Sequence, residues 1–245
     1  MTLTGKRALV TGASRGIGAS IAKALAAEGA DVAITYEKSA ELAAEVKRAI
    51  EAHGRRGVTI QADSADVAAV EAAVEKAVAQ LGGLDILVNN AGILRIAELK
   101  NMSLEDIDAI LHVNVRSPIV ASKAAIPHLK PGGRIINIGS FFADRVPSPV
   151  LGVYAGSKSA LVGFTRGLAR ELGPQEVTVN LIQPGSIDTD MNPANSPFSD
   201  TLKMITAFGR YGRADDIAHA VTFLANPKSQ YITGAALTVD GGAVA

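Results

Sequence analysis

Short apolar runs alternate with longer stretches of helical period from one end of the chain to the other. Seven of the runs are rich in β-type apolar residues and are bounded by turn residues, which predicts β-strands. They cover residues 8–11, 32–36, 58–61, 86–89, 134–138, 177–182 and 237–239. In the stretches between them alanine and leucine recur at helical spacing, which predicts helices over 17–28, 40–53, 67–81, 104–129, 154–172 and 215–224.

The order of these elements predicts an α/β fold. The strands are apolar on both faces, which is typical of a parallel sheet that is covered by helices on each side. Regular alternation of strand and helix then favours a single doubly wound, Rossmann-type sheet of about seven strands with helices on both faces. With 245 residues, 48% of them hydrophobic, the chain can fill one substantial core, so we expect one domain over residues 1–245.

The balance of residue types argues against several kinds of function. Lys plus Arg and Asp plus Glu are equal at 24 each, so no net charge would draw the protein to nucleic acid or to an anionic membrane. Aromatic residues make up only 4% and cysteine is absent, which argues against base-stacking surfaces and removes disulfides and thiolate metal sites. The four histidines, His53, His112, His128 and His219, lack metal-ligand spacing. We therefore expect no metal, no nucleic-acid partner, no membrane association and a cytoplasmic location.

One segment has no clear periodicity. Residues 186–201 are rich in Pro, Asn, Ser and Asp, a composition typical of surface loops. We expect residues 190–203 to act as a lid that closes over a substrate and excludes water.

A glycine-rich turn joins the first predicted strand to the first predicted helix. Its sequence is Thr11-Gly12-Ala13-Ser14-Arg15-Gly16-Ile17-Gly18, with the spacing Gly-x-x-x-Gly-x-Gly. Glycines in such a turn let a pyrophosphate approach backbone N–H groups at the positive end of a helix, because no Cβ atom stands in the way. The place of the turn between strand and helix therefore predicts a dinucleotide site.

A tyrosine and a lysine lie four residues apart in Tyr154-Ala155-Gly156-Ser157-Lys158, and so on one face of a predicted helix. An ammonium group about 4 Å from a phenol would lower the phenol pKa from ~10 toward neutrality. Such a phenol can give a proton to an alkoxide that forms during hydride transfer, or remove one from an alcohol in reverse. Ser140 follows the strand 134–138 at the carboxyl edge of the sheet, where its hydroxyl can hold a substrate carbonyl.

Taken in chain order, these motifs resemble those of the short-chain dehydrogenase/reductase family over essentially the whole chain. The matching segments are the glycine turn, Asp63, Asn89-Asn90-Ala91-Gly92, the catalytic tetrad of Asn114, Ser140, Tyr154 and Lys158, and Pro184-Gly185 followed by Thr189. The resemblance implies a homotetramer in which Tyr154 is the general acid and base, Lys158 also binds the nicotinamide ribose, and Asn114 positions a water in a proton relay. It implies a cofactor site made of Gly12, Ser14, Arg15, Gly16, Ile17, Gly18, Tyr36, Lys38, Ser39, Asp63, Ser64, Asn90, Ala91, Gly92, Tyr154, Lys158, Pro184, Gly185, Ile187 and Thr189.

The end of the second predicted strand indicates which nicotinamide cofactor is used. Tyr36 stands where NAD-preferring members of the family commonly carry Asp. Arg15 can pair with a 2′-phosphate, and Lys38 and Ser39 can add donors. We therefore expect NADPH/NADP+, with NADH not excluded because Glu37 could hydrogen-bond a free ribose.

The substrate is expected to be a hydrophobic ketone, aldehyde or secondary alcohol. Leu94, Phe141, Phe142 and residues 146–151 give the surroundings of the site an apolar character. The chain is similar both to 3-oxoacyl-thioester reductases and to broad carbonyl reductases, and no residue separates the two. Arg95 and Arg145 could meet an acidic carrier protein, but water is the simpler surrounding for two arginines.

One segment of the sequence suggests a second class of function. Residues 183–195 resemble family members that bind a cyclic dinucleotide and mediate biofilm dispersal, so a regulatory protein on the same fold is the alternative. Retention of the whole tetrad favours an enzyme, because binding alone would not require an activated phenol.

Overall fold

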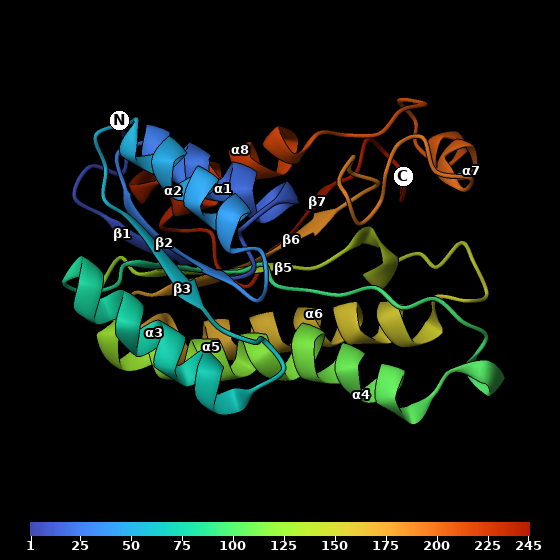
Figure 1. Ribbon diagram of the computed structural model, residues 1–245, viewed down its shortest axis with the longest axis horizontal. Coiled ribbons are helices and arrows are strands. Elements are labelled where there is room, and N and C mark those ends of the chain that lie inside the picture. The colour runs from blue at the N-terminus through green and yellow to red at the C-terminus, as the bar shows by residue number, and fades with distance from the viewer.

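A computed structural model describes all residues from Met1 to Ala245. Its centre is one sheet of seven parallel strands in the order β3-β2-β1-β4-β5-β6-β7 (Figure 1). This confirms the predicted doubly wound sheet. The strands are β1 Arg7–Val10, β2 Asp31–Tyr36, β3 Gly57–Gln61, β4 Ile86–Asn89, β5 Arg134–Ile138, β6 Thr178–Pro184 and β7 Ala236–Val239.

Helices cover both faces of the sheet. In Figure 1, α1, α2 and α8 lie on one side and α3, α5 and α6 lie on the other. The eight α-helices are α1 Gly16–Ala27, α2 Ala40–Glu51, α3 Val67–Leu81, α4 Leu104–Leu111, α5 Ser117–Ala125, α6 Gly152–Leu172, α7 Ser199–Met204 and α8 Ala214–Ala225. Short 3₁₀ turns cover Leu99–Asn101, Ile126–His128, Phe141–Ala143, Gly173–Gln175 and Pro227–Ser229.

Successive residues of each inner strand serve two different cores. Val10 packs with Leu25 and Val221 on the α1/α8 side, whereas its neighbour Leu9 packs with Val74 on the α3/α5/α6 side. All of these side chains are buried. The uninterrupted apolar runs are therefore explained by a sheet that is buried on both faces.

The segment predicted as a helix over 104–129 is helical from Leu104 to His128, but the helix is not regular. The structure has α4, a π turn over His112–Arg116, then α5 and a 3₁₀ turn. Ser117 N–H donates to His112 O, five residues back, which widens the helix by one residue. The cause is Pro118, because proline has no N–H to donate to the carbonyl of Asn114 and its ring crowds that carbonyl.

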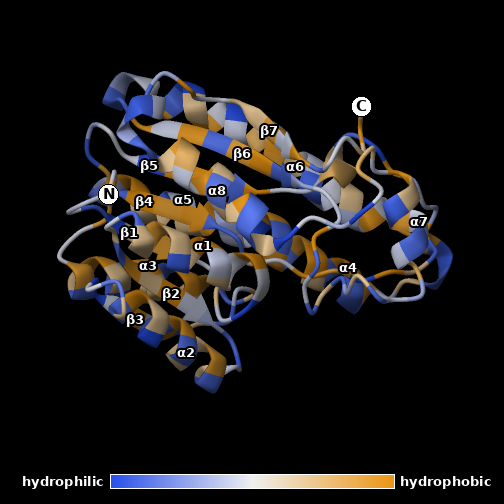
Figure 2. Ribbon diagram, turned by 90° about the horizontal axis from the view of Figure 1, so that it is seen from above, coloured by the Kyte–Doolittle hydropathy of each residue, from blue (hydrophilic) through white to orange (hydrophobic).

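The prediction of an irregular loop over 186–201 is wrong at its end, because helix α7 begins at Ser199. A short polar helix carries little apolar periodicity, so the composition did not reveal it. The start of the segment is also tied down by bridges between Ile187 and Gly212 and between Thr189 and Asn192. In Figure 1 and Figure 2, α7 lies near the C-terminus, at the end of the molecule that the strands point toward.

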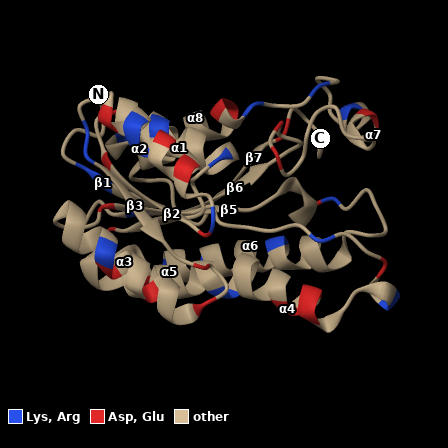
Figure 3. Cartoon of the chain, in the orientation of Figure 1, with Lys and Arg blue, Asp and Glu red and all other residues tan.

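Charged side chains of both signs are interspersed over the outer helices, as Figure 3 shows. Within the strands the only charged residues are Arg7, Asp31 and Arg134, each at the start of its strand. All other charges lie outside the sheet. None of the helices is long and apolar enough to span a bilayer.

Candidate active site

The glycine turn between β1 and α1 leaves no room for side chains. Gly12 has a φ of 62°, in the left-handed region, and a Cβ on it would lie 2.8 Å from Ala91 Cα. A Cβ on Gly18 would overlap the Asn90 amide and lie 2.8 Å from Ala13 Cα. The turn therefore presents bare backbone at the start of α1, which is the geometry that a pyrophosphate requires.

Asn90 holds this turn in place. Its Nδ2 donates to Thr11 O at 2.9 Å and to Gly12 O at 3.0 Å. In return, Thr11 Oγ1 accepts from Asn90 N at 3.0 Å and from Ala91 N at 3.1 Å. The β4 motif and the glycine turn are thus one hydrogen-bonded unit, although nearly eighty residues separate them in sequence.

Asn114 lies inside the π turn and is buried. Its Oδ1 accepts from Ile93 N at 2.9 Å, and its Nδ2 donates to Ile93 O at 3.0 Å and to Ser157 Oγ at 3.1 Å. Ser157 Oγ in turn donates to Tyr154 O at 2.6 Å. Ser157 is a site residue that was not predicted from the sequence, although its place between Tyr154 and Lys158 was an available signal.

Lys158 meets the other groups of the tetrad at the carboxyl end of β5. Its Nζ donates to Ile138 O at 3.0 Å and lies 5.9 Å from the centre of the Tyr154 ring. Ser140, two residues after β5, is buried and accepts from Phe142 N at 3.2 Å. A side chain on Gly92 would lie 3.4 Å from both Lys158 Nζ and Asn114 Oδ1. The structure therefore brings together the four residues of the predicted tetrad and the β4 motif.

The expectation of a lowered tyrosine pKa is wrong. Desolvation raises the pKa of Tyr154 to about 12, and the neighbouring Ser140 hydroxyl offsets only part of that increase. Desolvation also lowers the pKa of Lys158 to about 8. The spacing indicated the attraction between the two charges but not the loss of water around both groups. The loss of water has the larger effect on both pKa values.

The surroundings of Tyr154 are apolar, as the sequence predicts. The rings of Phe142 and Tyr154 meet edge to face with centres 6.2 Å apart, whereas Phe141 is buried in the protein interior. Large apolar side chains lie exposed on the segments beyond the strand ends, namely Ile96, Leu99, Leu104, Val146, Met191, Phe198, Met204 and Phe208.

The two arginines near this surface are both engaged. Arg95 pairs with Asp106 at 3.3 Å, and Arg145 Nη1 donates to Ala243 O at 2.6 Å. Both arginines are exposed, as expected, but each also has a partner within the chain. Arg145 ties the C-terminal segment to the loop that follows Ser140.

Charged groups cluster at the ends of β2 and β3. Lys38 Nζ lies 2.8 Å from Glu37 Oε1, and this carboxylate raises the pKa of Lys38. Arg15 lies 3.7 Å from Asp190, and both side chains are largely exposed. Of the other residues expected here, Tyr36 ends β2, Ser39 precedes α2, and Asp63 and Ser64 follow β3, where Asp63 Oδ1 accepts from Ala65 N. Glu37 is therefore partly neutralised by its neighbour.

The Pro184-Gly185 segment continues directly from β6. Gly185 N donates to Val239 O at 2.9 Å, which fixes the segment to β7. Thr189 lies over the glycine turn, since its Cγ2 is 3.5 Å from the position of a Cβ on Gly16. The side chain of Ile187 is buried and packs within the α1/α8 core. No group of three or more His, Asp or Glu side chains in the chain could hold a metal ion.

This arrangement matches that of a known family. Residues 12–244 match the family model described as enoyl-(acyl carrier protein) reductase. A short chain dehydrogenase from Burkholderia cenocepacia, solved in complex with NADP, is 58% identical over the whole of both chains and superposes with a TM-score of 0.99. The chain belongs to the short-chain dehydrogenase/reductase family.

Two further relatives of this short-chain dehydrogenase/reductase show how varied similar proteins are. A blue fluorescent protein from a metagenomic library, solved in complex with NADPH, is 51% identical over the whole of both chains, with a TM-score of 0.98. The cyclic-di-GMP-binding biofilm dispersal mediator protein of Escherichia coli is 44% identical over 238 residues, 97% of each chain. Membership in the family makes the chain an oxidoreductase, and its particular substrate has to be argued from the site.

Proposed function

We propose that the protein is an NADPH-dependent carbonyl reductase in which Tyr154 gives a proton to the substrate oxygen. The observation that carries this proposal is the meeting of Tyr154, Lys158, Ser140 and Asn114 at the carboxyl end of β5, beside the glycine turn. Ligands of open α/β sheets bind at this edge. NADPH supplies a hydride to the carbonyl carbon when it is bound there.

The proton chemistry of the residues suits reduction. With a pKa of about 12, Tyr154 keeps its proton at neutral pH, as a general acid must. When the proton moves to the substrate oxygen, the ammonium group of Lys158 stabilises the phenolate that is left. The Ser140 hydroxyl holds the carbonyl, and Asn114 is a positioning residue that links β4 to α6.

The residues fit NADPH at its pyrophosphate and at its 2′-phosphate. Gly12 and Gly18 form a cradle that a Cβ would fill, which suits the pyrophosphate. Arg15 supplies a cation for the 2′-phosphate, while Lys38 reduces the repulsion from Glu37. Asp190, now 3.7 Å from Arg15, would be displaced by that phosphate. The NADP and NADPH complexes of two relatives support the same choice.

The apolar residues around the mouth support a hydrophobic ketone or aldehyde as substrate. Exposed Leu99, Met191, Phe198 and Met204 come from two segments that flank the strand ends. We propose that residues 190–203, which include α7, cover the substrate as a lid. Tyr211 anchors the base of this segment through a 3.1 Å hydrogen bond to Asn192.

A homotetramer and a cytoplasmic location stay predictions. Support for self-association comes from the half-exposed edge strand β7 and from the exposed side chains of Phe223, in α8, and Tyr231, between α8 and β7. Light scattering coupled to size-exclusion chromatography measures the mass in solution directly.

The cyclic-dinucleotide alternative is not favoured. Residues 183–195 contain two aspartates and no lysine or arginine, so they offer no positive charge to phosphodiesters. Asp188 is already bound to Ala194 N, and Asp190 pairs with Arg15.

The direct test of the proposed function is NADPH consumption by the purified protein over a panel of hydrophobic ketones, quinones and an acetoacetyl thioester. We expect turnover with apolar carbonyls at a higher kcat/KM for NADPH than for NADH. Absence of turnover across the panel, with tight binding of a cyclic dinucleotide, would overturn the proposal in favour of the alternative.

A further inference from the structure

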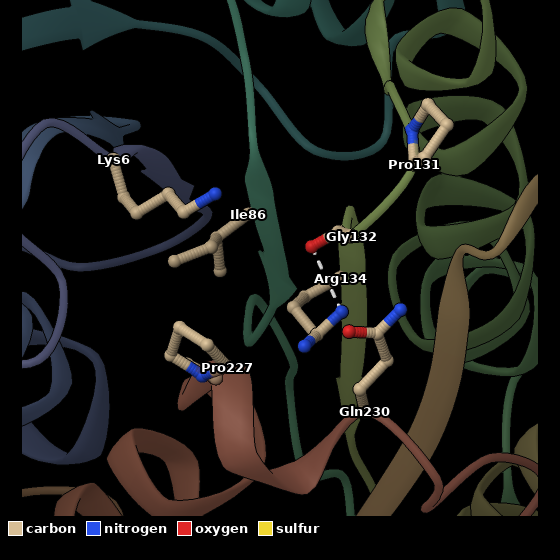
Figure 4. A pocket seen from close by; sticks show the side chains of 8 residues that line it. Lys6, Ile86, Pro131, Gly132, Arg134, Pro227 and Gln230 are labelled. Carbon is tan, nitrogen blue, oxygen red and sulfur yellow. Dashed lines mark hydrogen bonds between the residues drawn. The ribbon is translucent and has the colours of Figure 1, made fainter.

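A cavity lies at the amino end of the sheet, opposite the end that carries Tyr154. It has a volume of about 230 Å³ and opens where β1, β4 and β5 begin. These three strands are neighbours, since Ala8 pairs with Ile86 and Ile86 pairs with Arg134. In Figure 4, Lys6 and Arg134 stand on either side of one space, with Ile86 between them and Pro227 and Gln230 at its rim. None of the residues that line the cavity is acidic.

Arg134 forms the floor of this cavity and has no anionic partner. Only 2% of the residue is exposed. Its Nη1 donates to Gly132 O at 2.8 Å and Gly133 O at 3.1 Å, its Nη2 reaches Asn226 O at 3.5 Å, and its Nε has no partner. Asp85, whose backbone carbonyl accepts from Arg134 N, has its carboxylate bound by Arg7 at 2.7 Å.

A buried cation without a counter-charge is unfavourable, and arginine cannot relieve this by losing its proton. Lys6, the second cation of the cavity, also forms no ion pair. The chain therefore places two positive charges against one small space and provides no negative charge to balance them. The volume is below that of pockets that hold drug-sized ligands, so an occupant has to be small.

We propose that this cavity binds a small oxyanion, a free phosphate or a short carboxylate, between Arg134 and Lys6. The guanidinium supplies positive charge from the floor and one remaining Nη2 proton, and the ammonium of Lys6 closes over the anion from the side. Because the site lies at the end of the strands away from Tyr154, the anion stabilises the fold without entering the reaction.

The test measures the thermal unfolding midpoint as inorganic phosphate or succinate is added at constant ionic strength. Saturating NADP+ is present so that phosphate sites of the glycine turn are filled. We expect a saturable rise in the midpoint for the wild type. The apparent Kd should rise at least about tenfold in Lys6→Met, and the rise in the midpoint should vanish in Arg134→Met.

Lys228→Met is the matched control, because Lys228 is exposed on the neighbouring 3₁₀ turn and does not line the cavity. It removes the same charge and should keep the wild-type Kd. If Arg134→Met fails to fold, Lys6→Met decides. A midpoint that does not respond to either anion, or that responds equally in wild type and Lys6→Met, overturns the proposal; carbonyl reduction by Lys6→Met is unaffected in either case.

Discussion

Lys158 and Arg134 are two buried cations at opposite ends of the same strand, β5, and their surroundings differ in an instructive way. Neither has a carboxylate partner, and burial lowers the pKa of both. Lys158 contacts Ile138 O at the carboxyl end and faces Tyr154, whereas Arg134 borders a cavity at the amino end. A lysine can respond to burial by giving up its proton, and an arginine cannot. Burying a cation without a counter-charge is unfavourable at both ends of β5. At the carboxyl end it favours proton transfer by a lysine, and at the amino end it favours the binding of an anion by an arginine.

The comparison is most sharply tested by Lys158→Met, which keeps the shape of the side chain and removes its charge. We expect kcat to fall about 10²- to 10⁴-fold, because the proton donor loses the cation that stabilises its phenolate. We also expect the variant to be more stable at pH 7 by about 1–3 kcal/mol, since the folded wild type has to hold a lysine with a pKa of about 8 instead of 10.5. Chemical denaturation and steady-state kinetics measure the two effects.

The gain in stability should depend on pH in a defined direction. Between about pH 8 and 10.5 the unfolded chain binds the Lys158 proton more tightly than the folded chain does, so the stability of the wild type rises with pH there. The gap between the variant and the wild type therefore narrows across this window. A constant gap would show that the ammonium group is not the source of the cost.

Gly18→Ala tests whether the cradle at the carboxyl end is set by backbone contact. A Cβ would overlap the Asn90 amide and Ala13 Cα, so Asn90 must release the glycine turn. We expect NADPH affinity to fall about 10- to 100-fold, with a loss of stability of about 1–3 kcal/mol. Gly163→Ala in α6 is the control, because nothing lies within 4 Å of its Cβ position and both properties should be retained.

The rate of carbonyl reduction should also fall as the pH rises through the pKa of Lys158. Tyr154 stays protonated through this range, so the loss of the Lys158 proton determines where kcat/KM falls on the alkaline side of the pH profile. We expect kcat/KM to be level below pH 7, to fall through about pH 8, and to be about tenfold lower at pH 9. A profile that stays level to pH 10 would assign the proton chemistry to another group.

The smallest expected effect is that of Arg15→Ala on cofactor choice. Removing this exposed cation should lower kcat/KM about tenfold with NADPH and leave NADH unchanged, because only NADPH carries the 2′-phosphate. Asp190→Asn is the informative companion, since it removes the carboxylate that competes for Arg15 and should improve NADPH binding. Equal losses with both cofactors in Arg15→Ala would mean that Glu37 decides the preference.

Much of this site could be predicted from the sequence, because its parts depend on local rules. The glycine turn follows a strand and opens a helix. The four-residue spacing of Tyr154 and Lys158 places both side chains on one face of any α-helix. The π turn was not predicted even though Pro118 signals it, because apolar residues such as Val113 and Ile119 continue through this segment. The pKa of Tyr154 was predicted in the wrong direction, since the spacing of two residues does not reveal how far water is removed from both.

The amino-end cavity could not be predicted in the same way. Lys6 immediately precedes β1 and Arg134 begins β5, and β4 lies between these two strands in the sheet. A lone Arg at a strand start is ordinarily solvated, whereas Arg134 is buried beside a cavity that Pro227 and Gln230, from beyond α8, also line. Such a site depends on topology, not on a local motif.

The central claim, that Tyr154 gives the proton to the substrate oxygen, is tested most directly by kcat and the NADPH Kd of Tyr154→Phe, beside Tyr231→Phe as the control. Tyr231 is fully exposed, so its variant should match the wild type in both values. For Tyr154→Phe we predict a fall in kcat of about 10²- to 10⁴-fold with little change in the Kd, because the hydroxyl acts on the forming alkoxide and not on the nucleotide. A kcat close to that of the wild type would contradict the account.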